Sequence, residues 1–250
     1  MKSSVGETRD SFDYQWDRLK DSPWLLSNPR FRELCERILL DELGLSSRDI
    51  LGKLVLDVGS GNGRWSYAFK KLGAEVVAYD YSLHGVRETK KTGVDVVLAD
   101  ALHPPFRQSI FDVVFAFGVL HHTGDLENSF EANAKLVKSR GIMHVYLYGP
   151  KGKRLKLWRF FIQSLPSFRL REATIVVFSK IRNKVHFFGR VIPFSNVHGG
   201  FDALSPRINV ETDENHARTI FVKSGFCEIS RIKTAWCDWR VDIHMQGVRK

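Results

Sequence analysis

The chain has 250 residues, of which 43% are hydrophobic and 26% charged, and its formal net charge is +10. This length and apolar fraction suffice for one domain, or for one domain with an insertion. No run of 18 apolar residues and no signal-peptide core occur, and the three cysteines are odd in number and unpatterned. We therefore expect a cytoplasmic protein without a transmembrane segment, a disulfide framework or a metal site.

Helical and strand patterns alternate from about residue 30 to residue 148. Apolar residues recur at helical spacing from Phe31 to Leu43, and Gly44 follows as an end signal. Helices are also predicted after the first strand, near 83–91 and near 125–138, and strands at 54–58, 75–79, 95–99, 111–117 and 142–148. Aliphatic strands spaced by helices indicate a parallel sheet covered on both faces.

A glycine-rich turn joins the first of these strands to its helix. Asp57 stands near the end of the strand, and Gly59, Gly61 and Gly63 follow at alternate positions. A dinucleotide fingerprint, G-x-G-x-x-G, has glycine at its sixth position, where this chain has Arg64. The Gly-Lys-Ser/Thr sequence of a phosphate-binding P-loop is also missing. The turn therefore suits a ligand other than a pyrophosphate.

Acidic residues end three successive strands. Asp57 ends the first, Asp80 the second and Asp100 the third. Ligands of parallel sheets bind at the carboxyl ends of the strands, where Asp80 can accept hydrogen bonds from a ribose diol. Tyr81 offers a flat face for an adenine, and Asp100 can accept a hydrogen bond from an adenine amino group.

The chain changes character after residue 150. Residues 151–250 contain 19 Lys and Arg against 8 Asp and Glu, whereas residues 1–150 are nearly neutral. Residues 151–190, here called the basic segment, hold 11 of these cations and one acid, Glu172, interleaved with aromatic side chains. A helix near 212–224 with Thr212 as its cap, and strands near 226–234 and 240–247, are predicted to end the chain.

Five segments occur in the order and spacing of one enzyme family: VLDVGSGNG, VVAYD, LADALHPPF, FDVVFAFGVLHH and GIMHVYLY, between residues 55 and 148. They resemble the motifs of class I S-adenosylmethionine-dependent methyltransferases, in the branch whose fourth strand ends in VLHH. DALSPR (202–207) and Gly225-Phe226 are also similar to this branch. Ser139-Arg140-Gly141 departs from the usual double glycine.

The resemblance implies an α/β fold with a Rossmann-like seven-stranded sheet, flanking helices and an antiparallel last strand. An inserted lid is expected between the fifth strand and the C-terminal helix. We expect a helical leader at 1–45, a cofactor-binding core at 46–150, a basic aromatic lid at 151–205 and a C-terminal helix with two strands at 206–250.

The resemblance also implies the cofactor, S-adenosylmethionine, and the residues around it. The glycines would line its methionine part, Asp57 would organise their loop, Asp80 would hold the ribose, and Phe117 would wall the pocket. The expected cofactor-binding residues are Asp57, Gly59, Ser60, Gly61, Gly63, Asp80, Tyr81, Asp100, Ala101 and Phe117. Tyr14 and Trp16 lie in an aromatic leader that could cover the cofactor or simply pack.

The expected activity is methyl transfer to oxygen or nitrogen of a small-molecule acceptor by in-line displacement. His121 and His122 follow the fourth strand, and either could serve as a general base, with His121 preferred; alternatively the pair only shapes the pocket. The basic segment is expected to be a lid over the acceptor. The alternatives are nucleic acid binding, as in an RNA methyltransferase, and contact with an anionic membrane, as in a lipid or quinone methyltransferase. A non-catalytic binding protein with this fold is a further alternative, against which the intact acids and glycines speak.

Overall fold

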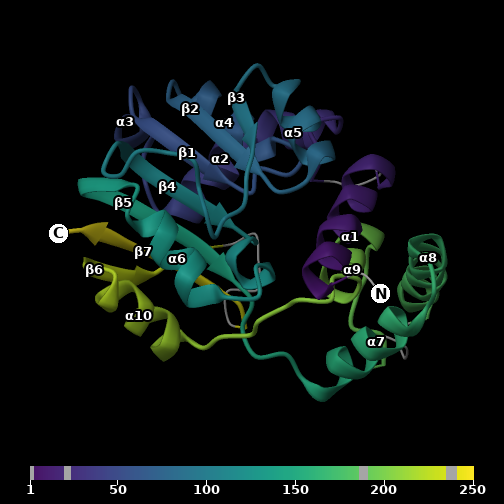
Figure 1. The fold of residues 1–250 in the computed structure, drawn as a ribbon. Coiled ribbons are helices and arrows are strands. Elements are labelled where there is room, and N and C mark those ends of the chain that lie inside the picture. The colour runs from purple at the N-terminus through teal and green to yellow at the C-terminus, as the bar shows by residue number, and fades with distance from the viewer. Residues whose placement is uncertain (1–2, 20–23, 186–190, 235–240) are drawn as a thin grey trace.

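The computed structural model describes residues 3–19, 24–185, 191–234 and 241–250. Its centre is a seven-stranded sheet in the order β3-β2-β1-β4-β5-β7-β6 (Figure 1). The strands are β1 (Leu54–Val58), β2 (Glu75–Asp80), β3 (Asp95–Leu98), β4 (Phe111–Phe117), β5 (Val137–Leu147), β6 (Phe226–Arg231) and β7 (Ile243–Arg249). The strands β1 to β5 pair in parallel, and β7 runs antiparallel to both β5 and β6. The predicted fold class is confirmed.

Helices cover both faces of the sheet because its central strands are apolar on both sides. On one face α6 (Leu126–Ala134) and α10 (Glu214–Lys223) pack through Phe130 and Phe221. On the other, α2 (Pro29–Leu43) and α4 (Arg64–Lys71) pack through Leu39 and Phe69. Buried apolar area of this kind contributes about 25 cal/mol per Å² to stability.

Local signals account for most helix ends. Helix α2 begins after Asn28, whose side chain accepts hydrogen bonds from two backbone amides, and ends at Gly44, where φ is 61°. The short α3 (Ser47–Ile50) and α5 (Leu83–Lys90) follow Ser46 and Ser82. A 3-10 turn, η1 (Leu120–His122), follows β4.

Several predicted boundaries were wrong. The strand expected near 226–234 ends at Arg231, and the strand expected near 240–247 runs as Ile243–Arg249, with residue 240 outside the described residues. The helix expected to reach residue 138 ends at Ala134, and β5 begins at Val137. Residues 138–141 bulge between two stretches that pair with β4, and Arg140 there has a φ of 64°. Thr212 does not cap α10; Asp213 does, by accepting a hydrogen bond from the amide of His216. The Thr212 amide instead donates to the carbonyl of Tyr148 at 2.9 Å.

A separate group of helices lies beside the carboxyl ends of the strands (Figure 1). We call α1 (Ser4–Arg18), α7 (Lys153–Ser164), α8 (Phe168–Lys184) and α9 (Val197–Leu204) the helical cap. These helices share their own apolar cluster, which includes Ile162, Ile175 and Phe201.

Polar contacts join α1 to the inserted helices of the cap. The Arg171 guanidinium lies 2.8 Å from a carboxylate oxygen of Glu7, and the Ser11 hydroxyl lies 2.8 Å from that of Ser205. The two helices of the expected leader, residues 1–45, therefore pack in different places: α1 belongs to the cap, and α2 packs against the sheet. Throughout the described ranges, each helix is too short or too polar to cross a bilayer.

Candidate cofactor and acceptor site

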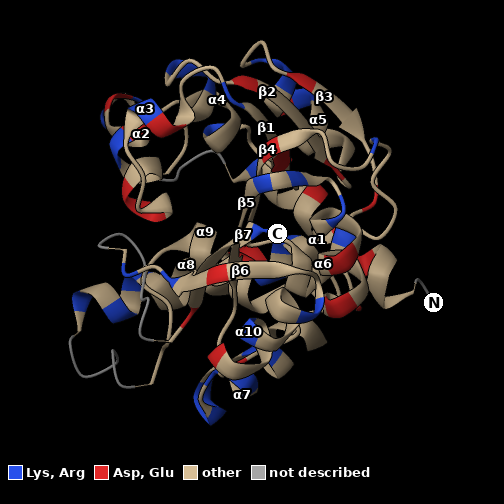
Figure 2. Ribbon diagram, turned by 90° about the vertical axis from the view of Figure 1, so that its left-hand side faces the viewer, with Lys and Arg blue, Asp and Glu red and all other residues tan. Residues whose placement is uncertain are grey.

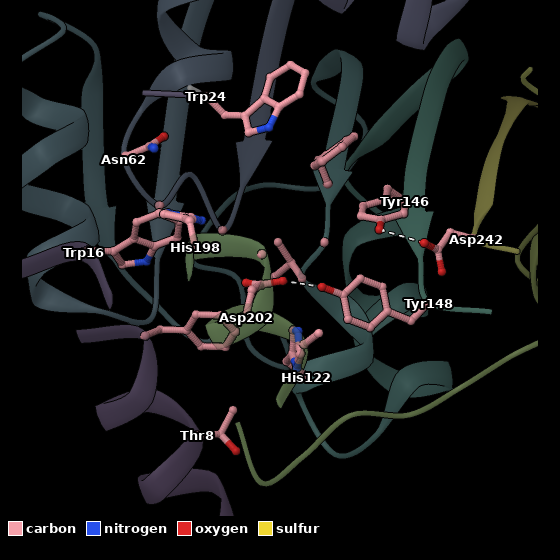
Figure 3. Close-up of a pocket in the computed structure, with 18 of the residues that line it drawn as sticks. Thr8, Trp16, Trp24, Asn62, His122, Tyr146, Tyr148, His198, Asp202 and Asp242 are labelled. Atoms are coloured by element: carbon pink, nitrogen blue, oxygen red, sulfur yellow. Dashed lines mark hydrogen bonds between the residues drawn. The ribbon is translucent and has the colours of Figure 1, made fainter. Parts of the chain in front are cut away.

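A cavity of about 940 Å³ lies where the strand ends face the helical cap (Figure 3). The loops after β1, β2, β3 and β4 supply one part of its wall. Residues of β5, α1, α7 and α9 supply much of the opposite part, and α2, α4 and α8 also contribute. Of the sequence-predicted site residues, the structure brings together Gly59, Ser60, Gly61, Asp80, Tyr81, Asp100, Ala101, Phe117, Trp16 and His122. Asp57, Gly63, Tyr14 and His121 do not line it.

The glycine loop is fastened to the end of β2. The amides of Gly59 and Ser60 both donate to the carbonyl of Tyr79, at 2.8 and 3.1 Å. The Gly61 amide donates to a carboxylate oxygen of Asp80 at 2.7 Å. Gly61 has a φ of 56°, and a Cβ there would come within 2.7 Å of the Trp16 indole. Position 61 therefore requires glycine, because the loop passes closely between β2 and α1 there.

Two carboxyl groups are buried beside this loop. Asp80 accepts from the amides of Gly61 and Ser82, both at 2.7 Å, and burial raises its pKa to about 6. Asp57 is 1% exposed and lies 2.5 Å from the Ser66 hydroxyl, which donates to it; burial raises its pKa to about 7. Buried carboxylates disfavour a pyrophosphate and suit a ligand that carries positive charge, as a sulfonium with an amino group does.

Replacing Asp57 with asparagine should make the ligand-free protein more stable at pH 8. The folded state holds the Asp57 proton more tightly than the unfolded chain, so the free energy of unfolding falls as pH rises from about 4 to about 7. The asparagine side chain has no charge to bury, so the advantage of the variant should grow across that window to a few kcal/mol. Urea unfolding at pH 4 and pH 8 measures it. An advantage that is equal at both pH values would contradict this assignment.

The remaining expected cofactor residues lie around the cavity as follows. Tyr81 is 41% exposed, with the Arg9 guanidinium 5.8 Å from its ring centroid. Asp100 accepts a hydrogen bond from the Leu102 amide at 2.9 Å, and the Ala101 carbonyl accepts one from Asn133 at 2.9 Å. The first bond lies within the loop after β3, and the second holds that loop to helix α6.

The aromatic leader divides between the cavity and the cap. Trp16 lines the cavity, and its indole packs 5.5 Å from the His198 ring (Figure 3). Tyr14 instead donates to Glu172 at 2.5 Å and stacks on Phe201. On a helix, residues two apart point to different sides, so only Trp16 can cover a ligand here.

Gly63, expected in the lining, lies behind it at the start of α4. Its φ is 75°, and a Cβ would come within 2.8 Å of the Thr89 backbone. This glycine lets α4 approach α5, which is a packing role.

The structure separates the two histidines, and His122, rather than the preferred His121, faces the cavity. His122 lines the cavity, and its Nδ1 lies 2.8 Å from the carbonyl of Ile208, to which it donates, so Nε2 keeps the lone pair. His121 is fully buried behind the cavity and stacks on Tyr148 at 4.1 Å between centroids. Burial lowers the pKa of both imidazoles below 6.5, so both are neutral at physiological pH.

Sequence reasoning missed a group of polar side chains opposite the glycine loop. The Tyr146 hydroxyl donates to Asp242 at 3.1 Å, and the Tyr148 hydroxyl donates to Asp202 (Figure 3). Lys151 also contacts Asp242. Tyr146 lies in β5 and Tyr148 directly follows the end of that strand, and both line the cavity. Their two-residue spacing is a signal that could have found them.

Glu42, His144 and His244 form the second buried polar cluster. In the parts of the chain that are described, these three are the group whose ligand-type atoms could hold a metal ion, since the atoms lie within 4.8 Å of one another. One oxygen of Glu42 lies 2.8 Å from His144 Nε2 and 2.5 Å from His244 Nδ1. These are hydrogen-bond distances, and donation by both imidazoles explains them without a metal. The cluster ties α2 to β5 and β7, and Glu42 also lines the cavity.

Comparison with known proteins agrees with this architecture. Residues 56–145 match the family described as methyltransferase domain. Demethylmenaquinone methyltransferase of Thermobifida fusca is 36% identical over 98 residues, which cover 36% of this chain and 41% of that protein. The probable tRNA methyltransferase 9B of Mus musculus is 29% identical over 107 residues, covering 41% of this chain and 23% of that protein. The chain thus spans less than half the length of these curated relatives.

A solved structure extends the likeness over the whole chain. Magnesium protoporphyrin IX methyltransferase from Synechocystis PCC 6803, solved with bound S-adenosylmethionine, covers 100% of this chain and 99% of its own, with a TM-score of 0.58 and 15% identity. At this identity the likeness shows the fold. Residues 56–145 thus match a methyltransferase domain, and the fold of the whole chain is similar to that of a methyltransferase solved with bound S-adenosylmethionine.

Proposed function

We propose that this protein transfers a methyl group from S-adenosylmethionine to oxygen or nitrogen of a small-molecule acceptor. The observation that carries the proposal is the continuous cavity, which joins the acid-and-glycine strand ends to a cluster of tyrosines and carboxylates. The bound cofactor supplies an activated methyl group on sulfur. The protein then has to align the acceptor and exclude water.

The cofactor half of the cavity is the edge formed by β1, β2 and β3. Asp80 would bind the ribose, Tyr81 the adenine face, and Asp100 with Ala101 the adenine edge. Gly59 and Gly61 would line the methionine part through their backbone. Asp57 would act from behind the loop, by keeping negative charge next to the amino group.

The acceptor half lies under the helical cap. Tyr146, Tyr148, Asp202 and Asp242 offer hydrogen-bonding groups there, and Phe12 and Leu155 offer apolar surface. Polar groups at fixed positions in a largely apolar cavity are typical of small-molecule sites. Two similarities support this proposal: the bacterial relative above is named for a quinone acceptor, and the solved structure for a porphyrin.

RNA methylation is the second candidate, and the basic segment favours it. Eleven cations stand against one acid there, and one relative is named a probable tRNA methyltransferase. Affinity that comes from phosphate contacts falls steeply with salt, with a log–log slope of several units. RNA binding that persists at 0.15 M salt, together with methylation of that RNA, would replace the small-molecule proposal.

Asp80→Asn should weaken binding of S-adenosylhomocysteine, the demethylated cofactor, at least tenfold. The variant loses charge-assisted hydrogen bonds to the ribose, each worth about 1.5–3 kcal/mol. Isothermal calorimetry measures the affinity, and Asp95→Asn is the matched control because Asp95 is exposed at the start of β3. Unchanged affinity in folded Asp80→Asn would remove the ribose assignment, and no binding by the wild type would remove the proposed activity.

A further inference from the structure

Helix α7 presents large apolar side chains to solvent. Leu157 is 69% exposed, Phe160 75% and Phe161 44%. Their spacing places them along one side of the helix, while Trp158 and Ile162 on the other side pack into the cap. We call Leu157, Phe160 and Phe161 the α7 stripe. Exposed apolar groups gathered in this way are typical of an interaction surface.

Cations lie beside the α7 stripe. Lys153, Arg154 and Lys156 are exposed in the first turn of the same helix. Lys156 also pairs with Glu211 at 3.0 Å. Figure 2 shows Lys and Arg concentrated on α7. The one acid of the basic segment, Glu172, accepts a hydrogen bond from Tyr14 and faces into the cap. The outer surface around the stripe is therefore positively charged.

We propose that the α7 stripe and its neighbouring cations dock this protein on an anionic lipid surface. A helix with lysine and arginine beside exposed phenylalanine and leucine has the pattern of helices that lie in the plane of a membrane interface. The phenylalanines and the leucine enter the headgroup boundary, and the cations meet anionic headgroups.

Other partners use only part of this surface. Nucleic acid phosphates would engage the cations and leave Leu157 in solvent. A second copy of this chain would bring two positively charged segments together, which costs free energy. Because Arg154 and Leu155 line the cavity, docking through α7 brings the cavity close to the lipid layer.

Sedimentation with vesicles tests the proposal. The wild-type protein should sediment with vesicles of phosphatidylcholine and phosphatidylglycerol at 0.15 M salt, and much less with phosphatidylcholine alone. Leu157→Asp/Phe160→Asp should lower the partition coefficient by about tenfold or more. Leu51→Asp/Val222→Asp is the matched control, because these side chains are 66% and 55% exposed and belong to the sheet domain. It adds the same charge and should change binding less than twofold.

The test does not depend on the proposed activity, because calorimetry with S-adenosylhomocysteine runs beside it. Both double variants should keep wild-type affinity for that ligand, which shows that they are folded. Failure of wild-type protein to sediment with anionic vesicles overturns the docking proposal, as does an equal loss in both variants. The docking proposal is also overturned if the wild-type protein is a dimer in sedimentation velocity and the Leu157→Asp/Phe160→Asp variant is a monomer. RNA binding at 0.15 M salt without vesicle binding assigns the surface to nucleic acid instead.

Discussion

Replacing Glu42 with alanine should lower the free energy of unfolding by about 3–5 kcal/mol, because removing one member of a buried polar cluster leaves the others without a partner. Glu42 is 2% exposed, and His144 and His244, both fully buried, donate to one of its oxygens. Burial alone would raise the pKa of Glu42, but these two histidines hold it below its ordinary value. The stabilisation is therefore complete above about pH 4.5 and is lost as pH falls below it.

Glu33→Ala is the matched control for this variant. Glu33 is exposed on the same helix, α2, and its replacement should change stability by less than about 0.5 kcal/mol. Glu42→Gln keeps an oxygen that can accept from one histidine, so it should lose less stability than the alanine variant. Urea unfolding at pH 7 measures all three. If Glu42→Ala is as stable as Glu33→Ala, the cluster does not hold α2 to the sheet.

His122→Asn should lower turnover by about 10²-fold or more, while leaving cofactor affinity unchanged. The Ile208 carbonyl fixes the His122 tautomer, and its Nε2, for which the described residues supply no partner, can take a proton from the acceptor. Because burial lowers the pKa of His122, the acidic limb of its pH–rate profile should lie below pH 6.5. Release of S-adenosylhomocysteine in the presence of the acceptor measures the rate.

His121→Asn is the internal control. His121 has the same side chain one residue away, but it lies behind the cavity against Tyr148. Its replacement should reduce stability and leave the pH–rate profile in place. Near-normal turnover of His122→Asn at pH 6–8 would reduce His122 to a wall residue, and loss of the acidic limb in His121→Asn would restore the order expected from sequence.

The strands at the centre of the sheet could be predicted from local pattern alone. β1 and β4 have the predicted boundaries, 54–58 and 111–117. Short apolar runs bounded by glycine or polar residues are compatible with few secondary structures other than a buried strand. The same aliphatic runs predicted where the glycine turn and the acidic residues lie. Each of these follows a strand, and parallel strands end at one edge of the sheet. The start of β5 was missed because residues 138–141 bulge against β4, and pairing rather than propensity decides that.

Side-chain direction in irregular backbone needed the tertiary structure. His121 and His122 are equivalent in sequence, yet the 3-10 turn η1 directs only His122 to the cavity. Tyr14 and Trp16 also separate, but they lie on the regular helix α1, and the packing of that helix decides which of the two faces the cavity.

Contacts between distant residues were equally beyond local pattern. Glu42 meets His144 and His244, 102 and 202 residues further on, only because the C-terminal end of α2 lies beside β5 and β7. The sequence by itself determined the central strands, the glycine turn with its acids and the resemblance to methyltransferases, because those depend on short-range periodicity and motif order. Only the tertiary structure decided which histidine faces the cavity and which carboxylates meet Tyr146 and Tyr148, because packing between remote segments sets those directions.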